Sequence, residues 1–186
     1  MTPSSPSLYQ QLLDVSEFFA RHRIEYMLIG GMAVGVWAAP RATADLDFVV
    51  GLDEAGLSTL IDAARGDGLV VFDVKPIHFK KMTLFRMFKP GEGDLLMIDC
   101  LLGDDPHKRQ ALTRAVTVTI EGGSLRVATA EDIVLLKLVS ARPQDLVDTE
   151  AILRLQKGSL DQRYLDEWAE RLVVSHTLAG LRAKLA

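Results

Sequence analysis

Two aspartates separated by a single residue are the clearest chemical signal in this sequence. Asp45 and Asp47 begin an apolar run that ends at Val50 and has the composition of a β-strand. Residues two apart in a strand lie on the same side, roughly 6.5 Å apart along the chain. Two catalytic metal ions lie about 3.5–4 Å apart, so this pair of carboxylates could bridge them. Because Mg²⁺ prefers carboxylate oxygens, we predict a two-ion Mg²⁺ site, which Mn²⁺ could also occupy.

A third acid stands alone in another apolar run. Asp99 interrupts the strand-like stretch from Leu95 to Leu102. An unpaired charge inside such a strand is costly unless a partner or a ligand compensates it. We therefore predict that Asp99 joins Asp45 and Asp47 as a third carboxylate on a neighbouring strand, with a paired structural acid as the alternative.

A pair of glycines precedes the aspartates. Gly30-Gly31 follows the apolar strand predicted for Ile24–Ile29 and leads into a short helix expected over Met32–Ala39. Free N–H groups at the start of a helix can bind phosphate. Taken alone, the pair favours a packed tight turn, because it has neither the Gly-Lys-Ser/Thr of a P-loop nor the spacing of a dinucleotide fingerprint. Beside the two acids, it favours a site for metal and nucleotide.

The basic residues allow more than one interpretation. Lys137 lies in an apolar helical stretch, from which it could extend to the surface or contact a phosphate group. The segment that contains Arg142, Asp145 and Asp148 could be a helix boundary with contacts between residues three apart. A first basic cluster could contact RNA or triphosphate, or it could be a solvated strand edge; it consists of His78, Lys80, Lys81, Arg86 and Lys89. A second cluster, residues 107–109, is interpreted as a solvated helix face.

These residues are expected on a small mixed sheet with helices packed on it, an α+β fold. Apolar periodicity predicts helices over residues 8–21, 53–65, 105–114, 130–142, 145–157 and 161–174, with a tail from residue 177. Strands are predicted over residues 24–29, 45–50, 69–74, 83–88 and 95–102, followed by a hairpin of 116–120 and 125–127. We expect a core over residues 1–128 and a C-terminal helical segment over residues 129–186 that packs on it as one compact unit.

The composition of the 186 residues fits a globular protein. Apolar residues make up 48% and charged residues 25%, and the net charge of −4 argues against a protein that coats nucleic acid by bulk electrostatics. The single cysteine, Cys100, is interpreted as a buried core residue. The first six residues lack the features of a secretory signal, and no apolar stretch reaches the roughly 20 residues of a membrane helix. We expect a cytoplasmic protein without membrane contact.

Together these motifs resemble those of the nucleotidyltransferase superfamily with the DNA polymerase β-like fold. The closest likeness, over roughly residues 24–155, is to the small bacterial nucleotidyltransferases of the AbiEii/AbiGii toxin type. Their glycine turn and Arg-x-Thr-x-Asp-x-Asp-Phe motif are matched by Gly30, Gly31, Arg41, Thr43, Asp45, Asp47 and Phe48, and their late motif by Lys137, Arg142, Asp145 and Asp148. Two positions differ, because Gly31 stands where many relatives have serine and Gln144 where a lysine is frequent.

The resemblance implies Mg²⁺-dependent transfer of a nucleoside monophosphate from an NTP to an acceptor hydroxyl, with release of pyrophosphate. The implied roles are catalysis and metal binding for Asp45, Asp47 and Asp99, nucleotide contacts for Gly30, Gly31, Arg41, Thr43 and Lys137, and accessory contacts for Arg142, Asp145 and Asp148. The acceptor implied by the resemblance is the 3′ end of tRNA, for a toxin, with a small antibiotic-like molecule or a protein side chain as alternatives. Such a toxin usually has a cognate antitoxin.

Two other classes of function fit the same residues. A nucleotide-binding or interaction module would keep the fold and bind NTP without releasing pyrophosphate. A purely structural domain would pair its acids with Arg41 or Arg86, and its melting temperature would not respond to Mg²⁺ and NTP. The three intact acids favour the enzyme over both.

Overall fold

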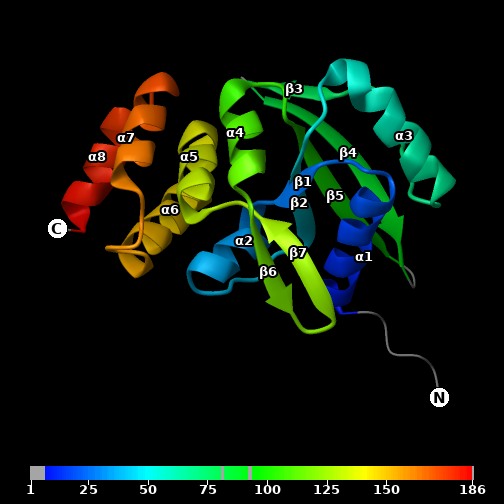
Figure 1. The fold of residues 1–186 in the computed structure, drawn as a ribbon, viewed down its shortest axis with the longest axis horizontal. Coiled ribbons are helices and arrows are strands. Elements are labelled where there is room, and N and C mark those ends of the chain that lie inside the picture. Colours follow the sequence, from blue (N-terminus) through cyan, green and yellow to red (C-terminus); the bar gives the residue numbers. More distant parts are fainter. Residues whose placement is uncertain (1–6, 81, 92–93, 186) are drawn as a thin grey trace.

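A seven-stranded mixed sheet runs through the centre of the computed structural model, which describes residues 7–80, 82–91 and 94–185 (Figure 1). The strand order is β3-β4-β5-β2-β1-β7-β6. The strands are β1 (Tyr26–Leu28), β2 (Asp45–Val50), β3 (Ile77–Phe79), β4 (Met82–Pro90), β5 (Leu95–Leu102), β6 (Val116–Ile120) and β7 (Gly123–Val127). The helices are α1 (Leu8–Arg21), α2 (Gly30–Trp37), the short 3-10 helix η1 (Glu54–Gly56), α3 (Leu57–Gly66), α4 (Pro106–Arg114), α5 (Ala130–Ser140), α6 (Pro143–Leu155), α7 (Gln162–Arg171) and α8 (Ser175–Lys184). The predicted α+β fold with a mixed sheet is confirmed.

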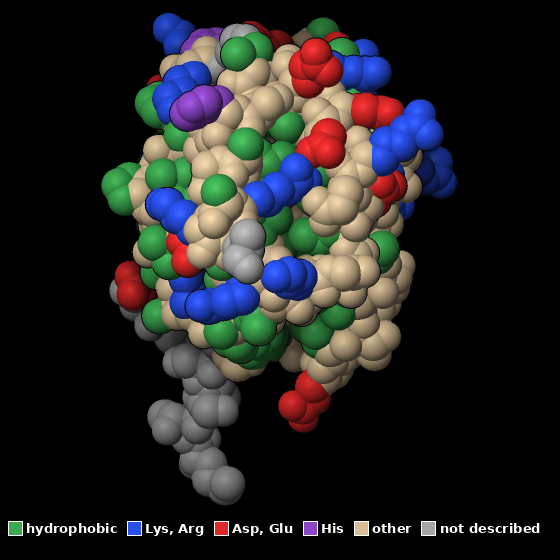
Figure 2. Space-filling view, turned by 90° about the vertical axis from the view of Figure 1, so that its left-hand side faces the viewer, with side chains coloured by type: hydrophobic (Ala, Val, Ile, Leu, Met, Phe, Trp, Pro, Cys, Tyr) green, Lys and Arg blue, Asp and Glu red, His purple; other side chains and the backbone are tan. Residues whose placement is uncertain are grey.

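Helices lie on either side of the strands in Figure 1, with α5 to α8 gathered on the left and α1 and α3 on the right. The side chain of Trp37 in α2 donates a hydrogen bond to the carbonyl of Ala128 at 2.9 Å, and Gln156 donates to the carbonyl of Trp37 at 2.7 Å. These bonds tie the C-terminal helices to α2, whereas the division into a core and a C-terminal segment stays a prediction. On the face turned toward the viewer in Figure 2, basic and acidic side chains are interspersed.

The structure also bears on the predicted burial of the cysteine and on the length of apolar helices. Cys100 of β5 is fully buried, as predicted. In the part of the chain that the structure describes, no helix has the length and apolar character needed to cross a membrane.

Strand β2 separates the hydrophobic core from a polar face of the sheet. Leu46 and Phe48 are fully buried, whereas Asp45 and Asp47 alternate with them and remain partly accessible. The ring of Phe48 packs edge-on against the ring of Phe19 in α1, with 5.1 Å between the centroids. Burial of such a side chain stabilises the fold by about 1.5–3 kcal/mol. The packed face therefore holds β2 in place while both aspartates point to the other face.

The strand predicted for residues 69–74 is wrong. Within this described segment, Val70 forms a single bridge with Phe88 of β4 and no ladder follows it. The carboxylate of Asp73 accepts a hydrogen bond from the backbone N–H of Lys75 at 2.9 Å, which forms a local turn just before β3. Strand β4 pairs with β3 instead, a three-residue strand with exposed side chains that was not predicted.

The interpretation of residues 107–109 as a solvated helix face is wrong for the first two of them. Lys108 is buried, and its Nζ binds the carboxylate of Asp104 at 2.6 Å. The imidazole of His107 is also buried and lies 5.0 Å from the ring of Trp168 in α7. A lysine can be buried on a helix when a nearby acid neutralises it, and charge alone does not reveal such a pairing in the sequence.

A buried hydrogen-bond cluster attaches α7 to α5. The hydroxyl of Tyr164 donates to Asp132 Oδ1 at 2.6 Å, and Thr129 donates to Oδ2 of the same fully buried carboxylate at 2.7 Å. We expect Tyr164→Phe to lower the free energy of unfolding by about 1–2 kcal/mol, because Asp132 loses a donor that water cannot replace. Tyr9→Phe, at an exposed hydroxyl of α1, should change it by less than about 0.5 kcal/mol in the same urea titration. Equal effects of the two variants would contradict this description of the cluster.

Candidate active site

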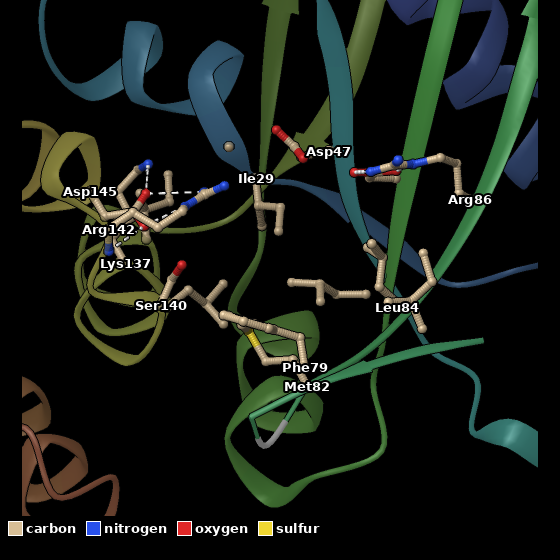
Figure 3. Close-up of a pocket in the computed structure, with 16 residues that line it drawn as sticks. Ile29, Asp47, Phe79, Met82, Leu84, Arg86, Lys137, Ser140, Arg142 and Asp145 are labelled. Atoms are coloured by element: carbon tan, nitrogen blue, oxygen red, sulfur yellow. Dashed lines mark hydrogen bonds and ion pairs between the residues drawn. The ribbon is translucent and has the colours of Figure 1, made fainter.

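The sheet register brings the three predicted acids together. Strands β2 and β5 pair in parallel, with Asp47 directly opposite Asp99, and Asp45 lies two residues before Asp47 on the same face. In Figure 3, Asp47 lies between Ile29, which links β1 to α2, and the side chain of Arg86 on β4. The structure therefore groups carboxylates from two neighbouring strands at one point on the open face of the sheet.

Asp47 is the electrostatically unfavourable member of the group. Burial and the negative charges of Asp45 and Asp99 raise the pKa of its carboxyl from the usual 3.8 to about 6. Asp45 is fixed by the hydroxyl of Thr43, which donates to its Oδ1 at 2.7 Å. Thr43 thus orients one carboxylate of the pair, while the other lies close to two like charges that a bound cation would offset.

The glycine pair lets the backbone approach the acids. Gly30 has φ +66°, and a Cβ at this position would lie 1.9 Å from Oδ2 of Asp47, which no side chain can tolerate. A Cβ at Gly31 would lie 3.0 Å from the Cβ of Thr43 and 3.1 Å from Nη2 of Arg41. Helix α2 begins at Gly30 without a side-chain cap, so its first N–H groups are available beside Asp47.

Lys137 is buried rather than extended to the surface. Its Nζ lies 3.0 Å from Oδ1 of Asp145 and 2.7 Å from Oδ2 of Asp148, and the residue is 6% exposed. Burial alone would raise the pKa of Asp145, but hydrogen bonds from Arg142 and Ser140 and the charge of Lys137 lower it to about 2. The lysine and the two acids of the late motif therefore form one buried ionic cluster, and the contact of Lys137 with phosphate stays a prediction.

Two arginines complete this cluster. Arg41 donates from Nε and Nη2 to the two oxygens of Asp148 at 3.2 and 3.1 Å. Arg142 donates to Asp145 at 2.8 and 3.2 Å, and Gln144 donates to Asp148 at 2.9 Å. Gln144 thus keeps a polar contact where a lysine is frequent among relatives. A purely structural role for the acids predicted a pairing with Arg41 or with Arg86. Arg41 pairs with Asp148 and not with the acids of β2, whereas Arg86 pairs with Asp99 of β5.

A pocket of about 340 Å³ joins the acids to this cationic cluster (Figure 3). The predicted site residues that line it are Gly30, Asp47, Asp99, Lys137, Arg142 and Asp145. The other predicted residues, all of them described, do not line it: Gly31, Arg41, Thr43, Asp45 and Asp148. Gly31 and Arg41 border a separate hollow of about 340 Å³ formed with α1 and the β6–β7 hairpin.

The pocket also has an apolar wall that sequence reasoning missed. It consists of side chains from β3, β4, β5 and α5, namely Ile77, Phe79, Met82, Leu84, Leu101, Ile133 and Leu136. In Figure 3, Phe79, Met82 and Leu84 lie on the opposite side of the pocket from Asp47. Leu84 and Leu101 stand two residues from Arg86 and Asp99 on their strands, so period-two spacing from these polar residues was the available signal.

Asp99 already has a cationic partner. Arg86, one member of the basic strand-edge cluster, donates from Nε to Oδ1 at 2.7 Å and from Nη2 to Oδ2 at 2.8 Å. Among the described residues, no three histidine, cysteine or acidic side chains are arranged so that they could hold a metal ion. Asp45 and Asp47 still offer the oxygen ligands that Mg²⁺ favours, on one face and without a cationic partner among the described residues. The residues therefore fit a divalent ion at this pair.

The buried ionic cluster should be sensitive to loss of its lysine. We expect Lys137→Met to lower the free energy of unfolding by about 3 kcal/mol, because two buried carboxylates lose a shared cation while the aliphatic packing is kept. Lys157→Met removes the same charge from an exposed site and should lower the free energy of unfolding by less than about 0.5 kcal/mol in the same chemical denaturation. A cost for Lys137→Met as small as this would contradict the cluster.

Comparisons with known proteins also indicate a nucleotidyltransferase. One protein-family model, described as nucleotidyl transferase AbiEii toxin of a type IV toxin–antitoxin system, matches residues 11–184. The chain is similar to an antigenic nucleotidyltransferase-like protein from Paracoccidioides brasiliensis, with a TM-score of 0.57 and 17% identity over 98% of this chain and 94% of that one. It is also similar to the antibiotic-resistance factor ANT(2″)-Ia, with a TM-score of 0.57 and 14% identity over 94% and 96% of the two chains. Among curated proteins, none matches the sequence.

The structural similarities establish a shared fold, and the family model establishes the relationship. Its match extends from α1 to α8 and includes both the acids of β2 and the ionic cluster of α5 and α6. The chain therefore belongs to the AbiEii family of nucleotidyl transferase toxins and is a nucleotidyltransferase enzyme.

Proposed function

We propose that this protein transfers a nucleoside monophosphate from an NTP to an acceptor hydroxyl in the pocket described above, with release of pyrophosphate. The observation that carries the proposal is the arrangement of charge around a single pocket. Asp47 and Asp99 stand on one wall, Lys137 and Arg142 on another, and the backbone of Gly30 lies directly against Asp47. A negatively charged triphosphate needs such a combination of cation, acid and free N–H groups.

Each part of the site has a distinct task in this reaction. Asp45 and Asp47 would hold Mg²⁺, for which Mn²⁺ could substitute. A bound ion would neutralise charge on the triphosphate and the leaving pyrophosphate. The N–H groups that follow Gly30 would bind phosphate oxygens, and Lys137 and Arg142 would stabilise the charge that develops on the leaving group. The apolar wall would exclude water, which is the competing acceptor.

The chemical step is a displacement at the α-phosphorus of the NTP. The acceptor oxygen forms a new bond to that phosphorus, and the bond from the α-phosphorus to the oxygen that bridges to the β-phosphorus breaks. The electron pair of the broken bond leaves with pyrophosphate, and the proton of the acceptor hydroxyl passes to a carboxylate of the acidic group. Positioning accounts for much of the rate in such reactions, because the transfer itself needs little covalent help from the protein.

We propose RNA as the acceptor, namely the 3′ end of tRNA, and a cognate antitoxin as the partner that restrains the enzyme. The support for this choice is that the matching family model describes a toxin of a type IV toxin–antitoxin system. The net charge of −4 and the mixed charges in Figure 2 are unsuited to coating a long nucleic acid. They are compatible with capture of a single nucleotide end in the pocket, where the apolar wall could contact a base. Such a reaction would take place in the cytoplasm. A small molecule is the second candidate, because the similar protein ANT(2″)-Ia is an antibiotic-resistance factor.

The proposal is tested by incubating the protein with each α-labelled NTP in turn, Mg²⁺ and a whole-cell extract that is then separated into RNA, protein and small molecules. We expect label in the RNA fraction, dependent on Mg²⁺, and none with the Asp45→Asn/Asp47→Asn variant. Label in the small-molecule or protein fraction would identify a different acceptor class. Equal labelling by the wild type and the double variant would contradict the proposed site.

A further inference from the structure

We infer that Arg86 takes the place of a second metal ion at Asp99, so that this site holds one divalent ion, on Asp45 and Asp47. The inference rests on the proposed function, in which these two acids bind Mg²⁺. It departs from the two-ion arrangement predicted from the sequence. It also gives a role to Arg86, a residue that the sequence motifs do not include.

The contact between Arg86 and Asp99 occupies both oxygens of the carboxylate. The two donor–acceptor distances are 2.7 and 2.8 Å, the paired geometry in which a guanidinium fork binds a carboxylate most strongly. In Figure 3, Arg86 extends from β4 toward β5 and ends in this contact. An ion at Asp99 would therefore have to lie against a permanently charged guanidinium or displace it.

The sheet register places this arginine at Asp99. Strands β4 and β5 are antiparallel, and Arg86 is the cross-strand partner of Asp99, just as Asp47 is its partner on the other side in β2. The three residues thus form a row across three strands on one face. Because neighbouring strands lie about 4.8 Å apart, the guanidinium reaches Asp99 without leaving its strand position. The pairing is built into the backbone and does not depend on a flexible loop.

The other cations of the pocket are engaged elsewhere. Lys137 and Arg142 bind Asp145, and no described side chain forms an ion pair with Asp45 or Asp47. The three acids of the sheet carry three negative charges when ionised, and Arg86 contributes one positive charge. The remaining two negative charges match a single divalent ion at the unpaired acids. A second divalent ion would lie close to a guanidinium, which repels it.

The experiment counts bound Mn²⁺ by electron paramagnetic resonance, with the metal alone added to the folded protein. We expect one ion per chain for the wild type and a spectrum without coupling between ions. Arg86→Met should bind two ions and show spin coupling, because ions about 3.5–4 Å apart interact. The Arg86→Met/Asp99→Asn variant should return to one ion, because the new ligand has been removed.

Two controls make each outcome decisive. Arg154→Met removes one positive charge from an exposed position of α6 and should leave the count at one. Circular dichroism checks that Arg86→Met is folded, which is expected because the arginine side chain is 38% exposed. A coupled pair in the wild type, or a single ion in folded Arg86→Met, would overturn this inference and leave the proposed function intact. A wild type that binds no Mn²⁺, like Asp45→Asn/Asp47→Asn, would overturn both.

Discussion

Replacing Asp47 by asparagine is expected to abolish nucleotidyl transfer and, in the absence of metal, to stabilise the fold. The loss of activity should exceed about 100-fold, since even residues that merely support metal ligands contribute about 10–100-fold. The gain in stability follows from the unfavourable position of the carboxylate, which is largely removed from water and lies near the negative charges of Asp45 and Asp99. A pKa raised from 3.8 to about 6 corresponds to at most about 3 kcal/mol at neutral pH, and we expect about 1–3 kcal/mol.

The sign of this effect can be followed with pH. The folded state favours the protonated form of Asp47, so the destabilisation is fully present above about pH 6 and disappears as the pH falls toward 4. Thermal unfolding in a chelator should therefore show wild type and Asp47→Asn converging as the medium is acidified from pH 7. Asp62→Asn, at an exposed acid of α3, should match the wild type in activity and stability. A variant that is inactive but destabilised at pH 7 would contradict the electrostatic account.

Gly30→Ala should be the most damaging of the glycine substitutions. The added Cβ would meet Oδ2 of Asp47 at 1.9 Å, so either the carboxylate or the start of α2 must move. A displacement of about 1 Å at a reacting centre can reduce the rate by about 100-fold. The positive φ of +66° adds about 1–2 kcal/mol of backbone strain.

Gly68→Ala is a control that has the backbone strain of Gly30→Ala without its steric clash. Gly68 also has a positive φ, of +77°, but no atom lies within 4 Å of the position that an added methyl group would occupy. The variant should lose about 1 kcal/mol of stability and keep full activity, whereas Gly30→Ala should lose both. The comparison requires a denaturation curve and a transfer rate for each variant. Equal activities would mean that the contact between Gly30 and Asp47 has no part in catalysis.

Local features of the site could be predicted from the sequence because they depend on short-range geometry. The alternation of Asp45 and Asp47 with apolar residues determines that both face away from the core, and the structure shows this. The glycine turn beside them follows from the same short segment. Helix α1 and strands β2 and β5 have the predicted bounds, since their apolar periodicity is strong.

Contacts between distant segments could not be predicted in this way. The pairing of Asp99 with Asp47 and Arg86 depends on the register of three strands, and a shift of one residue would have moved the carboxylate to the other face. The bond between Arg41 and Asp148 joins residues 107 positions apart. Strand β3 pairs with the edge of β4, and its three residues, Ile77-His78-Phe79, are too short a run for alternation to predict a strand.

The central claim is that the bond between the α- and β-phosphates of an NTP is the one that breaks. It is tested most directly with two batches of one NTP, labelled at the α- or the γ-phosphate, supplied with Mg²⁺ and the acceptor fraction. The account predicts that the α label enters the acceptor and that the γ label leaves as pyrophosphate, in equal molar amounts. Transfer of the γ label to the acceptor, or its release as orthophosphate, would contradict it.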